Sequence, residues 1–448
     1  MPETITALTL GQLAQRYRDG ALDPVGVTEA YLDAIAAHPD GAKVYRVVTA
    51  ERALRQARAA QRLFERGVDL GPLQGVPLAI KDLVDTAGEV SASGSKVLAE
   101  RPPAAQDAPV AARLDAAGTV FLGRTNMTEL AYSGLGLNPH YGTPGAAPDR
   151  ERVPGGSSSG SGVAVASGLA AVAVGSDTGG SVRIPAAVNG VVGLKTTDGR
   201  IPTEGCVPLS TTLDTLGPMA RTVDDAWALY LAMAAEPHRP LAPAPRRLTL
   251  LAPTTLVLDE LDEQVAAGYE AALARLEGLG HEVRREPLPL LAEAPALYER
   301  YGSFAGHEVW ALYEEEFTTR GAEIDPRVVQ RVLLGSRRLS ADYLRLVYGR
   351  AALRRRFWPE LAGVDAVVAP TIPRLPPRIA EVESDDAAYH EANRLILRNT
   401  APFNVLASPA ASVTAARTPG GLPVGLMIAT RPGEEELALA IAKLFDGC

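Results

Sequence analysis

The chain has 448 residues, of which 46% are apolar and 22% are charged, a composition typical of globular proteins. A chain of this length buries roughly 75% of its unfolded surface on folding, so its core does not depend on disulfide bonds. Its two cysteines, Cys206 and Cys448, provide neither a disulfide framework nor the spacing of a metal site. The net charge of −9, from 53 acidic and 44 basic residues, argues against nucleic acid as a direct partner.

The N-terminus reads Met-Pro-Glu-Thr-Ile-Thr and has neither the basic nor the apolar region of a signal peptide. No uninterrupted apolar run approaches the roughly 20 residues that span a bilayer. We therefore expect a cytoplasmic protein that does not insert into a membrane. Cys448, the last residue, is expected to fray.

The N-terminal half predicts helices followed by an alternation of strands and helices. Apolar residues recur at helical spacing through residues 1–66, and a short apolar run within Gly71–Asp82 is typical of a buried strand. A helix over Ala108–Ala117 and a strand over Thr119–Gly123 come next. Residues 155–193 hold ten glycines and seven serines between apolar runs. Such a composition predicts a tightly folded segment with close backbone approaches rather than a flexible linker.

The C-terminal half follows a proline-rich segment at 237–247, which is predicted to be an exposed connector. A strand at Leu248–Leu251, a helix near Glu260–Gly278 and further helices to about Trp358 come after it. The remaining predicted elements are strands at Val364–Ala369, Ala410–Thr414 and Val424–Ala429 and a last helix at Glu434–Phe445. Because strands are predicted on both sides of the connector, we expect a single α/β/α domain over residues 1–448, with a central twisted mixed sheet surrounded by helices.

Lys81 ends one of the predicted buried strands, in the segment Val-Pro-Leu-Ala-Ile-Lys-Asp at 76–82. Burying an ammonium group is costly unless it is paired, and desolvation lowers the pKa of a lysine. A neutral lysine amine can serve as a general base. From these residues alone it is equally open that Lys81 forms an ion pair with Asp82 or Asp85 at the end of the strand.

Two glycine–serine motifs provide candidate nucleophiles. Ser157 lies in Pro-Gly-Gly-Ser-Ser-Ser-Gly-Ser-Gly at 154–162, and Ser181 lies in Gly-Ser-Asp-Thr-Gly-Gly-Ser-Val-Arg-Ile-Pro at 175–185. A serine directly after two glycines can have its hydroxyl flanked by unobstructed backbone N–H groups, which are the donors that stabilise an oxyanion. A serine nucleophile needs an adjacent base, and a Ser–Lys arrangement is a known alternative to histidine.

Together these segments resemble the amidase-signature family. Gly155–Gly160 and Asp177–Ala186 match the two parts of that family's central motif, and Ser157 and Ser181 are 24 positions apart. Other similar segments are Gly75–Asp82, which carries the lysine, Gly123–Ala131 and Leu213–Thr222. The resemblance is strong over residues 8–230 and continues more weakly through Asp365–Pro370, Asn399–Asn404 and Pro423–Met427.

The resemblance implies a catalytic relay of three residues and no metal or other cofactor. Ser181 would be the nucleophile, and Ser157, after a cis peptide bond, would bridge it to Lys81. The implied oxyanion hole consists of the backbone N–H groups of Thr178, Gly179, Gly180 and Ser181. The residues implied to brace the loops rather than react are Ser158, Asp177 and Arg183.

Two other serine motifs occur, and each lacks part of its context. Gly156–Gly160 satisfies the Gly-x-Ser-x-Gly elbow of α/β-hydrolases with Ser158 at its centre, but residues 147–154 form a poor strand before it. Ser93–Lys96 satisfies the Ser-x-x-Lys motif of penicillin-recognising enzymes, but the partner motif Lys-Thr-Gly fails at Thr197. No metalloprotease motif and no Walker-type nucleotide motif occurs.

The resemblance predicts hydrolysis of an amide, urea or carbamate to a carboxylic acid and ammonia or an amine. The expected partner is a small-molecule amide, and the expected assembly is a monomer or a homodimer. The side chains named for the acyl pocket are Met127, Tyr132, His140, Phe304 and Phe403, with Tyr301 and Trp310 as further aromatic candidates.

An alternative function on the same fold is that of the amidotransferase A subunit, which releases ammonia from glutamine within a tRNA-dependent complex. There the glutamine ammonium is held by an aspartate that lies five residues before the proline of a Pro-Val-Asn segment. Leu397 occupies that position here, five residues before Pro402, whereas the arginine for the glutamine carboxylate has a counterpart in Arg331. Because a leucine cannot pair with an ammonium group, we expect an amidase that acts on apolar or aryl amides without partner proteins and does not use glutamine.

Overall fold

A mixed sheet of 11 strands runs through residues 4–447, the part of the chain that the computed structural model describes. Its order from edge to edge is β1-β3-β2-β4-β6-β5-β10-β11-β9-β7-β8. The strands are β1 (Tyr45–Val48), β2 (Pro77–Lys81), β3 (Val120–Thr125), β4 (Val172–Asp177), β5 (Val192–Lys195), β6 (Thr215–Ala220), β7 (Thr249–Pro253), β8 (Glu282–Glu286), β9 (Ala366–Pro370), β10 (Ala410–Arg417) and β11 (Pro423–Ala429).

The two halves of the sequence meet inside this sheet, where β5 pairs with β10. Ala410 lies opposite Lys195 in this antiparallel pair. β2 pairs in parallel with β3 and β4, and β7 pairs in parallel with β8 and β9. The strands in the middle of the sheet are antiparallel. Strands from both sides of the predicted connector therefore share one mixed sheet.

Helices make up most of the remaining structure, with short 3-10 helices at Ile5–Ala7, Leu98–Glu100, Glu129–Ala131, Gly321–Glu323 and Lys443–Phe445. The helices of the first half are α1 (Leu10–Arg18), α2 (Pro24–Ala37), α3 (Gly41–Val44), α4 (Ala50–Glu65), α5 (Pro109–Ala116), α6 (Ser159–Ala166), α7 (Arg183–Asn189) and α8 (Val223–Met233). Those of the second half are α9 (Glu263–Gly278), α10 (Leu290–Tyr301), α11 (Phe304–Thr319), α12 (Pro326–Ser336), α13 (Ser340–Glu360), α14 (Ile379–Glu383), α15 (Asp386–Arg398), α16 (Ala401–Val405) and α17 (Glu435–Ala442).

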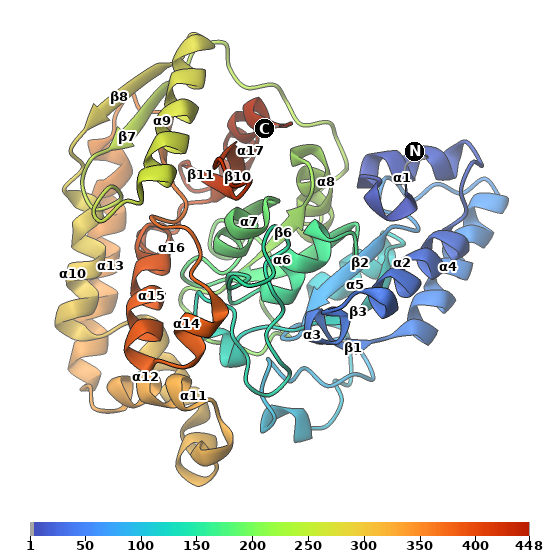
Figure 1. Ribbon diagram of the computed structural model, residues 1–448, viewed down its shortest axis with the longest axis horizontal. Coiled ribbons are helices and arrows are strands. Elements are labelled where there is room, and N and C mark those ends of the chain that lie inside the picture. The colour runs from blue at the N-terminus through green and yellow to red at the C-terminus, as the bar shows by residue number, and fades with distance from the viewer. Residues whose placement is uncertain (1–3, 448) are drawn as a thin grey trace.

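Helices contact the sheet along its whole length. α2 and α4 pack on β3, α6, α7 and α8 contact the middle strands, and α9 and α17 pack on β10 and β11. Figure 1 shows α1, α2 and α4 on one side of the molecule and α9, α10 and α13 on the other, with β10 and β11 between them. Every residue of β2, β4, β6, β9 and β11 is buried, as expected for strands covered on both faces. The prediction of an α/β fold with a mixed sheet surrounded by helices is confirmed.

Two edge strands, β1 and β8, are present where the sequence predicts helices. β1 interrupts the helical region at 1–66, and β8 lies between α9 and α10. The sequence of β8 is Glu-Val-Arg-Arg-Glu, and none of its residues is buried. An exposed edge strand of this kind carries no apolar alternation, so periodicity cannot detect it.

The glycine- and serine-rich stretch at 155–193 is folded, as predicted, into α6, β4 and α7. Its glycines permit close backbone contacts. A Cβ atom at Gly160 would lie 2.3 Å from the carbonyl oxygen of Val44, and Gly155 has a φ of +72°. Neither position accommodates an ordinary side chain without a shift of the backbone.

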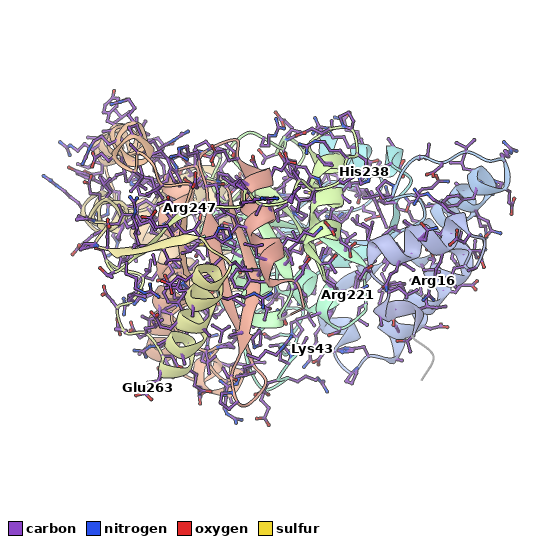
Figure 2. The ribbon with its side chains drawn as sticks, turned by 90° about the horizontal axis from the view of Figure 1, so that it is seen from above. Arg16, Lys43, Arg221, His238, Arg247 and Glu263 are labelled. Atoms are coloured by element: carbon purple, nitrogen blue, oxygen red, sulfur yellow. The ribbon has the colours of Figure 1, made fainter. Side chains whose placement is uncertain are left out.

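Residues 237–247 contain no helix or strand and are mostly exposed, which agrees with the predicted connector. Figure 2 labels His238 and Arg247, which lie near the two ends of this connector. The assignment of residues 1–448 to a single domain stays a prediction.

No helix within residues 4–447 is both long and apolar enough to cross a membrane. In the same residues no group of three or more His, Cys, Asp and Glu side chains is placed to hold a metal ion. Cys206 is a free thiol. Cys448 and the first three residues lie outside the described part of the chain, so the expectations for both ends are not addressed by the structure.

Candidate active site

The parallel pairing of β2 and β4 places the ends of both strands at the same edge of the sheet. Lys81 is the last residue of β2, and Asp177 is the last residue of β4. Two loops return to this edge, because Ser157 precedes α6 and Ser181 precedes α7. The carboxyl ends of parallel strands are a common position for ligand sites. Here Lys81 contacts Ser157, and the backbone of Ser181 lies beside that of Ser158.

Lys81 is fully buried and hydrogen-bonded to serine. Its Nζ atom donates to the Oγ atom of Ser157 over 2.7 Å and to the Oγ atom of Ser176 over 2.8 Å. A longer contact of 3.5 Å joins Nζ to the carbonyl oxygen of Ser176. The peptide bond between Gly156 and Ser157 is cis, in agreement with the resemblance.

The alternative for Lys81, an ion pair with Asp82 or Asp85, is not formed. The carboxylate of Asp82 instead binds Arg46 at 2.6 Å and Arg124 at 2.9 Å. Lys81 has no ion pair with any carboxylate in residues 4–447. Its amine therefore faces hydroxyl groups rather than a counter-charge.

Burial lowers the pKa of Lys81 to about 7, because low-polarity surroundings favour the neutral amine. The carboxylates of Asp177 and Asp214 raise this pKa, but by less than burial lowers it. A substantial share of Lys81 is therefore neutral near pH 7. In that form its amine can accept a proton from Ser157 across their 2.7 Å contact.

Ser181 lies beside Ser158 at the start of α7. The backbone N–H of Ser158 donates to the carbonyl oxygen of Ser181 over 3.3 Å. The hydroxyl of Ser158 in turn donates to the carbonyl oxygen of Ser176 over 3.3 Å. Ser158 thus links the loop that carries Ser157 to the loop that carries Ser181, and its hydroxyl is engaged with the backbone.

Asp177 and Arg183, at the two ends of the loop 177–183, form a fully buried ion pair. Nη2 of Arg183 lies 2.9 Å from Oδ1 of Asp177, and Nε lies 3.0 Å from Oδ2. The carboxylate also accepts the backbone N–H groups of Gly180 and Val182 over 2.8 and 3.1 Å. Burial alone would raise the pKa of Asp177, but the charge and hydrogen bonds of Arg183 hold it well below its usual range.

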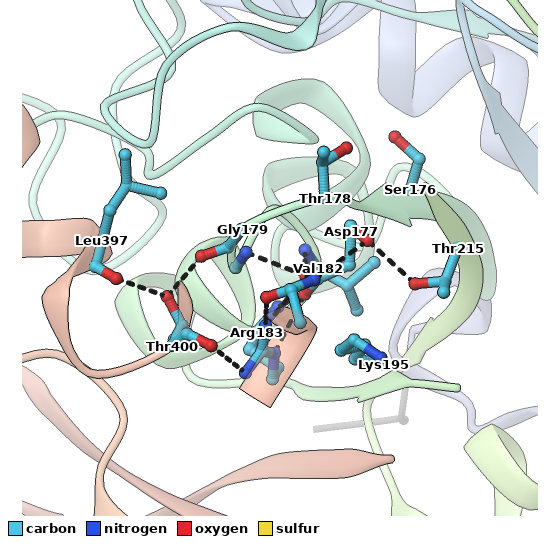
Figure 3. Close-up of polar contacts among 12 residues, drawn as sticks. Ser176, Asp177, Thr178, Gly179, Val182, Arg183, Lys195, Thr215, Leu397 and Thr400 are labelled. Carbon is cyan, nitrogen blue, oxygen red and sulfur yellow. Dashed lines mark hydrogen bonds and ion pairs between the residues drawn. The ribbon is translucent and has the colours of Figure 1, made fainter. Parts of the chain in front are cut away.

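The second half of the chain braces the same loop from the other side. The Thr400 hydroxyl donates to the carbonyl oxygen of Gly179 over 2.6 Å, and Nη1 of Arg183 donates to the carbonyl oxygen of Thr400 over 3.0 Å. Figure 3 shows Thr400 between Leu397, Gly179 and Arg183. Asn404 donates to Asp177 over 2.8 Å and accepts from Arg183 over 2.6 Å.

A cavity of about 190 Å³ opens beside Ser181. Residues of both halves of the chain line it, and most of them are apolar. They are Ala131, Tyr132, Ser133, Thr178, Gly179, Ser181, Leu209, Leu213, Tyr298, Ser303, Ala305, Arg331, Leu397 and Ala401.

Of the five side chains named for the acyl pocket, Tyr132 lines this cavity. The guanidinium of Arg331 lies over the Tyr132 ring at 4.1 Å and donates to the Tyr132 carbonyl oxygen. The structure places Phe304 and Phe403 in two separate hydrophobic clusters, where both are fully buried. They pack the core and do not reach the cavity wall.

Met127 and His140 also lie away from the lining of the cavity. Met127 is fully buried, with its sulfur 3.9 Å from the Ser93 hydroxyl, and His140 contacts the carboxylate of Glu129 at 2.8 Å. The further aromatic candidates, Tyr301 and Trp310, do not line it either.

Several residues that shape the site are not among those that sequence reasoning names. Ser176 lies inside the motif at 175–185, so its contact with Lys81 has a signal in the sequence. Asn404 lies in the weakly similar segment Asn399–Asn404. Tyr298 and Leu209 reach the cavity wall from α10 and from a loop, and no local pattern marks them.

The two rival serine motifs are not supported by the structure. No strand precedes Gly156–Gly160, because residues 147–154 contain only isolated bridges. Ser93 contacts Met127, while Lys96 is exposed to solvent. Neither serine has the surroundings that its motif requires.

The sequence model of the Amidase family matches residues 26–439. The chain belongs to the Amidase family. A 2-amino-5-chloromuconic acid deaminase from Comamonas testosteroni is 38% identical in a 445-residue alignment that covers 97% of this chain and 95% of that relative. The A subunit of the glutamyl-tRNA(Gln) amidotransferase from Streptomyces coelicolor is 36% identical in a 465-residue alignment that covers 95% of this chain and 92% of that relative.

Solved structures of the Amidase family share the fold over nearly the whole chain. A crystal structure of an amidase matches with a TM-score of 0.88 and 33% identity, covering 98% of this chain and 99% of that one. The substrate complex of a 6-aminohexanoate cyclic dimer hydrolase matches with a TM-score of 0.86 and 28% identity, covering 99% and 97%. Family membership and these relatives identify the protein as an amide-hydrolysing enzyme.

The buried ion pair makes a testable contribution to stability. Arg183→Met should lower the free energy of unfolding by about 3–5 kcal/mol, because it leaves the Asp177 carboxylate buried without its partner. Chemical denaturation measures the loss. The matched control is Arg356→Met, which removes half-exposed ion pairs with Glu293 and Glu360 and should lower the free energy of unfolding far less, because solvent screens exposed charges. Equal losses in the two variants would contradict a special contribution of the buried pair.

Proposed function

We propose that this amide-hydrolysing enzyme cleaves the carbon–nitrogen bond of a linear amide through an acyl-enzyme on Ser181. Ser157 and Lys81 relay the proton in this scheme, and the reaction uses no metal or other cofactor. The cavity beside Ser181 holds the acyl part of the substrate. The products are a carboxylic acid and ammonia or an amine, and the enzyme acts as a monomer or homodimer.

The proposed reaction begins when the Ser181 hydroxyl oxygen attacks the carbonyl carbon. The Ser181 proton passes to Ser157, whose own proton passes to the neutral amine of Lys81. The carbon–nitrogen bond then breaks, and the leaving nitrogen takes the proton back from the relay. Water attacks the acyl-enzyme by the same route, which releases the acid and restores Ser181.

Backbone N–H groups of the loop 177–183 supply the proposed oxyanion hole. The N–H of Gly180 donates to Asp177, so it is already occupied in this conformation. We therefore assign the hole to the N–H groups of Thr178, Gly179 and Ser181 rather than to all four residues that the family resemblance implies. The bonds from Thr400 and Arg183 support this assignment, because they hold the loop in one conformation.

The observation that carries the proposal is the buried contact of 2.7 Å between Lys81 and Ser157. A lysine in a surface ion pair keeps its charge, whereas a buried lysine whose pKa is lowered to about 7 can exchange a proton at neutral pH. Ser176, the other hydroxyl on Nζ, orients the amine toward Ser157.

For the rival function, that of the amidotransferase A subunit, some observations are favourable and one is unfavourable. A relative that carries this name is 36% identical to the chain, and Arg331 lines the cavity where a carboxylate of the substrate could bind. Leu397 lines the same cavity at the position where the amidotransferase places its ammonium-binding aspartate. The cavity therefore suits an acyl group that is apolar or ends in a carboxylate, and none of the described residues in its wall offers a carboxylate to an α-ammonium group.

The first prediction concerns the nucleophile. Ser181→Ala should remove essentially all amide hydrolysis and leave the fold intact, because a small side chain in the cavity wall contributes little to packing. A fluorophosphonate probe followed by peptide mass spectrometry should modify Ser181 in the wild type. Ser158→Ala is the control for the rival motif, and an adduct on Ser158 would contradict the assignment.

The second prediction concerns the base. Lys81 accepts a proton only when it is neutral, so kcat/KM should rise with pH through about 7 and level off above it. A profile of kcat/KM from about pH 5 to 9 measures this rise, which is the acidic limb of the profile. His140→Gln is the control, because His140 contacts Glu129 away from the cavity and should leave the limb in place. A limb that disappears in this variant would assign it to histidine instead.

The third prediction separates the amidase from the amidotransferase function. The wild type, without partner proteins, should hydrolyse the des-amino analogue of glutamine faster than glutamine, because Leu397 cannot hold the ammonium group. Leu397→Asp should reduce this preference for the des-amino analogue or reverse it in favour of glutamine. Arg331→Met should reduce kcat/KM for glutamine and for its des-amino analogue alike, because both carry a carboxylate that Arg331 could bind. The expected loss is roughly 10- to 100-fold, the value of a hydrogen bond to a charged group. Strong glutamine hydrolysis that requires tRNA and a B-type partner protein would contradict the proposal.

A further inference from the structure

A second cavity, of about 610 Å³, lies next to the cavity beside Ser181. Both cavities are lined by Tyr298, Leu397 and Ala401, which therefore form the wall between them. Helices α10, α15 and α16 provide most of the lining of the second cavity, and most of its side chains are apolar. Its volume falls within the range of pockets that bind small molecules, roughly 300–1,000 Å³.

The second cavity lies where the parallel strands β7 and β9 end. β7 ends at Pro253 and β9 at Pro370, and Leu256, which follows β7, lines the cavity. The side-chain amide of Asn399 joins the two ends, because it donates to the carbonyl oxygens of Val257 over 3.1 Å and of Pro370 over 2.9 Å. The carboxyl ends of parallel strands are a common position for ligand sites. The second half of the chain thus has such an edge of its own.

Arg398 lines this cavity with hydrogen-bond donors to spare. Its Nε atom donates to Oδ1 of Asn399 over 3.1 Å, and its Nη2 atom donates to the carbonyl oxygen of Val257 over 3.3 Å. Its Nη1 atom has no hydrogen-bond partner in the described part of the chain. Because a guanidinium has five N–H donors, these two contacts leave donors for a ligand.

The charge of Arg398 is also left without a direct partner. Within residues 4–447 no carboxylate forms an ion pair with it, whereas Arg394 in the same wall pairs with Glu260 at 3.1 Å and with Glu391 at 2.7 Å. Burial lowers the pKa of Arg398 from its ordinary value, because loss of solvation disfavours the charged form. Glu299, the carboxylate in the wall, is exposed at the side where the cavity meets solvent.

We propose that the second cavity is a binding site for a free, small carboxylate with an apolar body, and that the carboxylate pairs with Arg398. The apolar wall suits the body, and the guanidinium suits the charged group, since an arginine can donate to both oxygens of a carboxylate. Such a ligand lies outside the cavity that holds the acyl group, against the wall that the two cavities share. The site takes no part in the chemistry at Ser181, so this inference does not rest on the proposed function.

The test is calorimetric titration with 4-phenylbutyrate, which has an apolar body and one carboxylate. The protein is the Arg331→Met variant, so that the cavity beside Ser181 no longer offers an arginine. We expect saturable binding of one molecule per chain. Adding Arg398→Met should weaken this binding by roughly 10- to 100-fold, the value of hydrogen bonds to a charged group. Arg398→Lys should weaken it less, because lysine keeps the charge but lacks the paired donors.

The matched control is Arg374→Met, which removes an exposed arginine that pairs with Glu260 at 3.2 Å and does not line the cavity. It should leave the affinity unchanged. The neutral analogue 4-phenylbutanol separates a direct contact from a structural effect, because Arg398 also holds the carbonyl group of Val257. Arg398→Met should weaken binding of the acid and leave binding of the alcohol nearly as it was. Acetate should bind more weakly than 4-phenylbutyrate, since it lacks the apolar body.

Three results would overturn the carboxylate site. They are no saturable binding to the Arg331→Met protein, an unchanged affinity for the acid after Arg398→Met, and equal losses for the acid and the alcohol in that variant. The first result would place any binding by the wild type in the cavity beside Ser181. The titrations involve no turnover, so failure of amide hydrolysis or of labelling at Ser181 would overturn the proposed function and leave the carboxylate site standing.

Discussion

The buried ion pair between Asp177 and Arg183 is the interaction on which the rest of the site depends. Two charges in a dry interior are stable only if all their hydrogen-bonding capacity is used, and here backbone N–H groups, the carbonyl oxygen of Thr400 and the side chain of Asn404 complete it. The loop between the two residues carries Ser181 and the proposed oxyanion donors. Its conformation is therefore set by electrostatics that no substrate has to provide.

A comparison of two buried lysines shows what distinguishes the proposed base. Burial lowers the pKa of Lys195 to about 8, but its Nζ atom donates to the carbonyl oxygens of Thr196 and Ser408 and lies 3.6 Å from Asp198. Carbonyl oxygens have no proton to exchange. Lys81 has hydroxyl partners instead, and a hydroxyl can both give and take a proton. The identity of the partner, more than burial, separates a structural lysine from a proposed catalytic one.

Local sequence is sufficient for what depends on neighbouring residues. The buried strand that ends at Lys81 and the glycine-rich loops around Ser157 and Ser181 are predicted because composition and short motifs determine them. The wall of the cavity beside Ser181 is not predicted, because it forms from segments that lie up to hundreds of residues apart in the sequence. Phe304 and Phe403 are aromatic residues in segments that lie near the cavity, yet both side chains pack in hydrophobic clusters of the core. No periodicity records which side of a helix will face a cavity.

The pairing of β5 with β10 joins two halves that contribute differently to the site. The proposed relay comes entirely from residues before the connector. The cavity beside Ser181 is shaped in part by residues beyond the connector, namely Tyr298, Arg331 and Leu397. New substrates can therefore be acquired during evolution by drift in the second half while inherited chemistry persists in the first. Thr400 and Asn404 are the exceptions, since they support the reacting loop across the junction. They mark the limit to how freely the two halves can diverge.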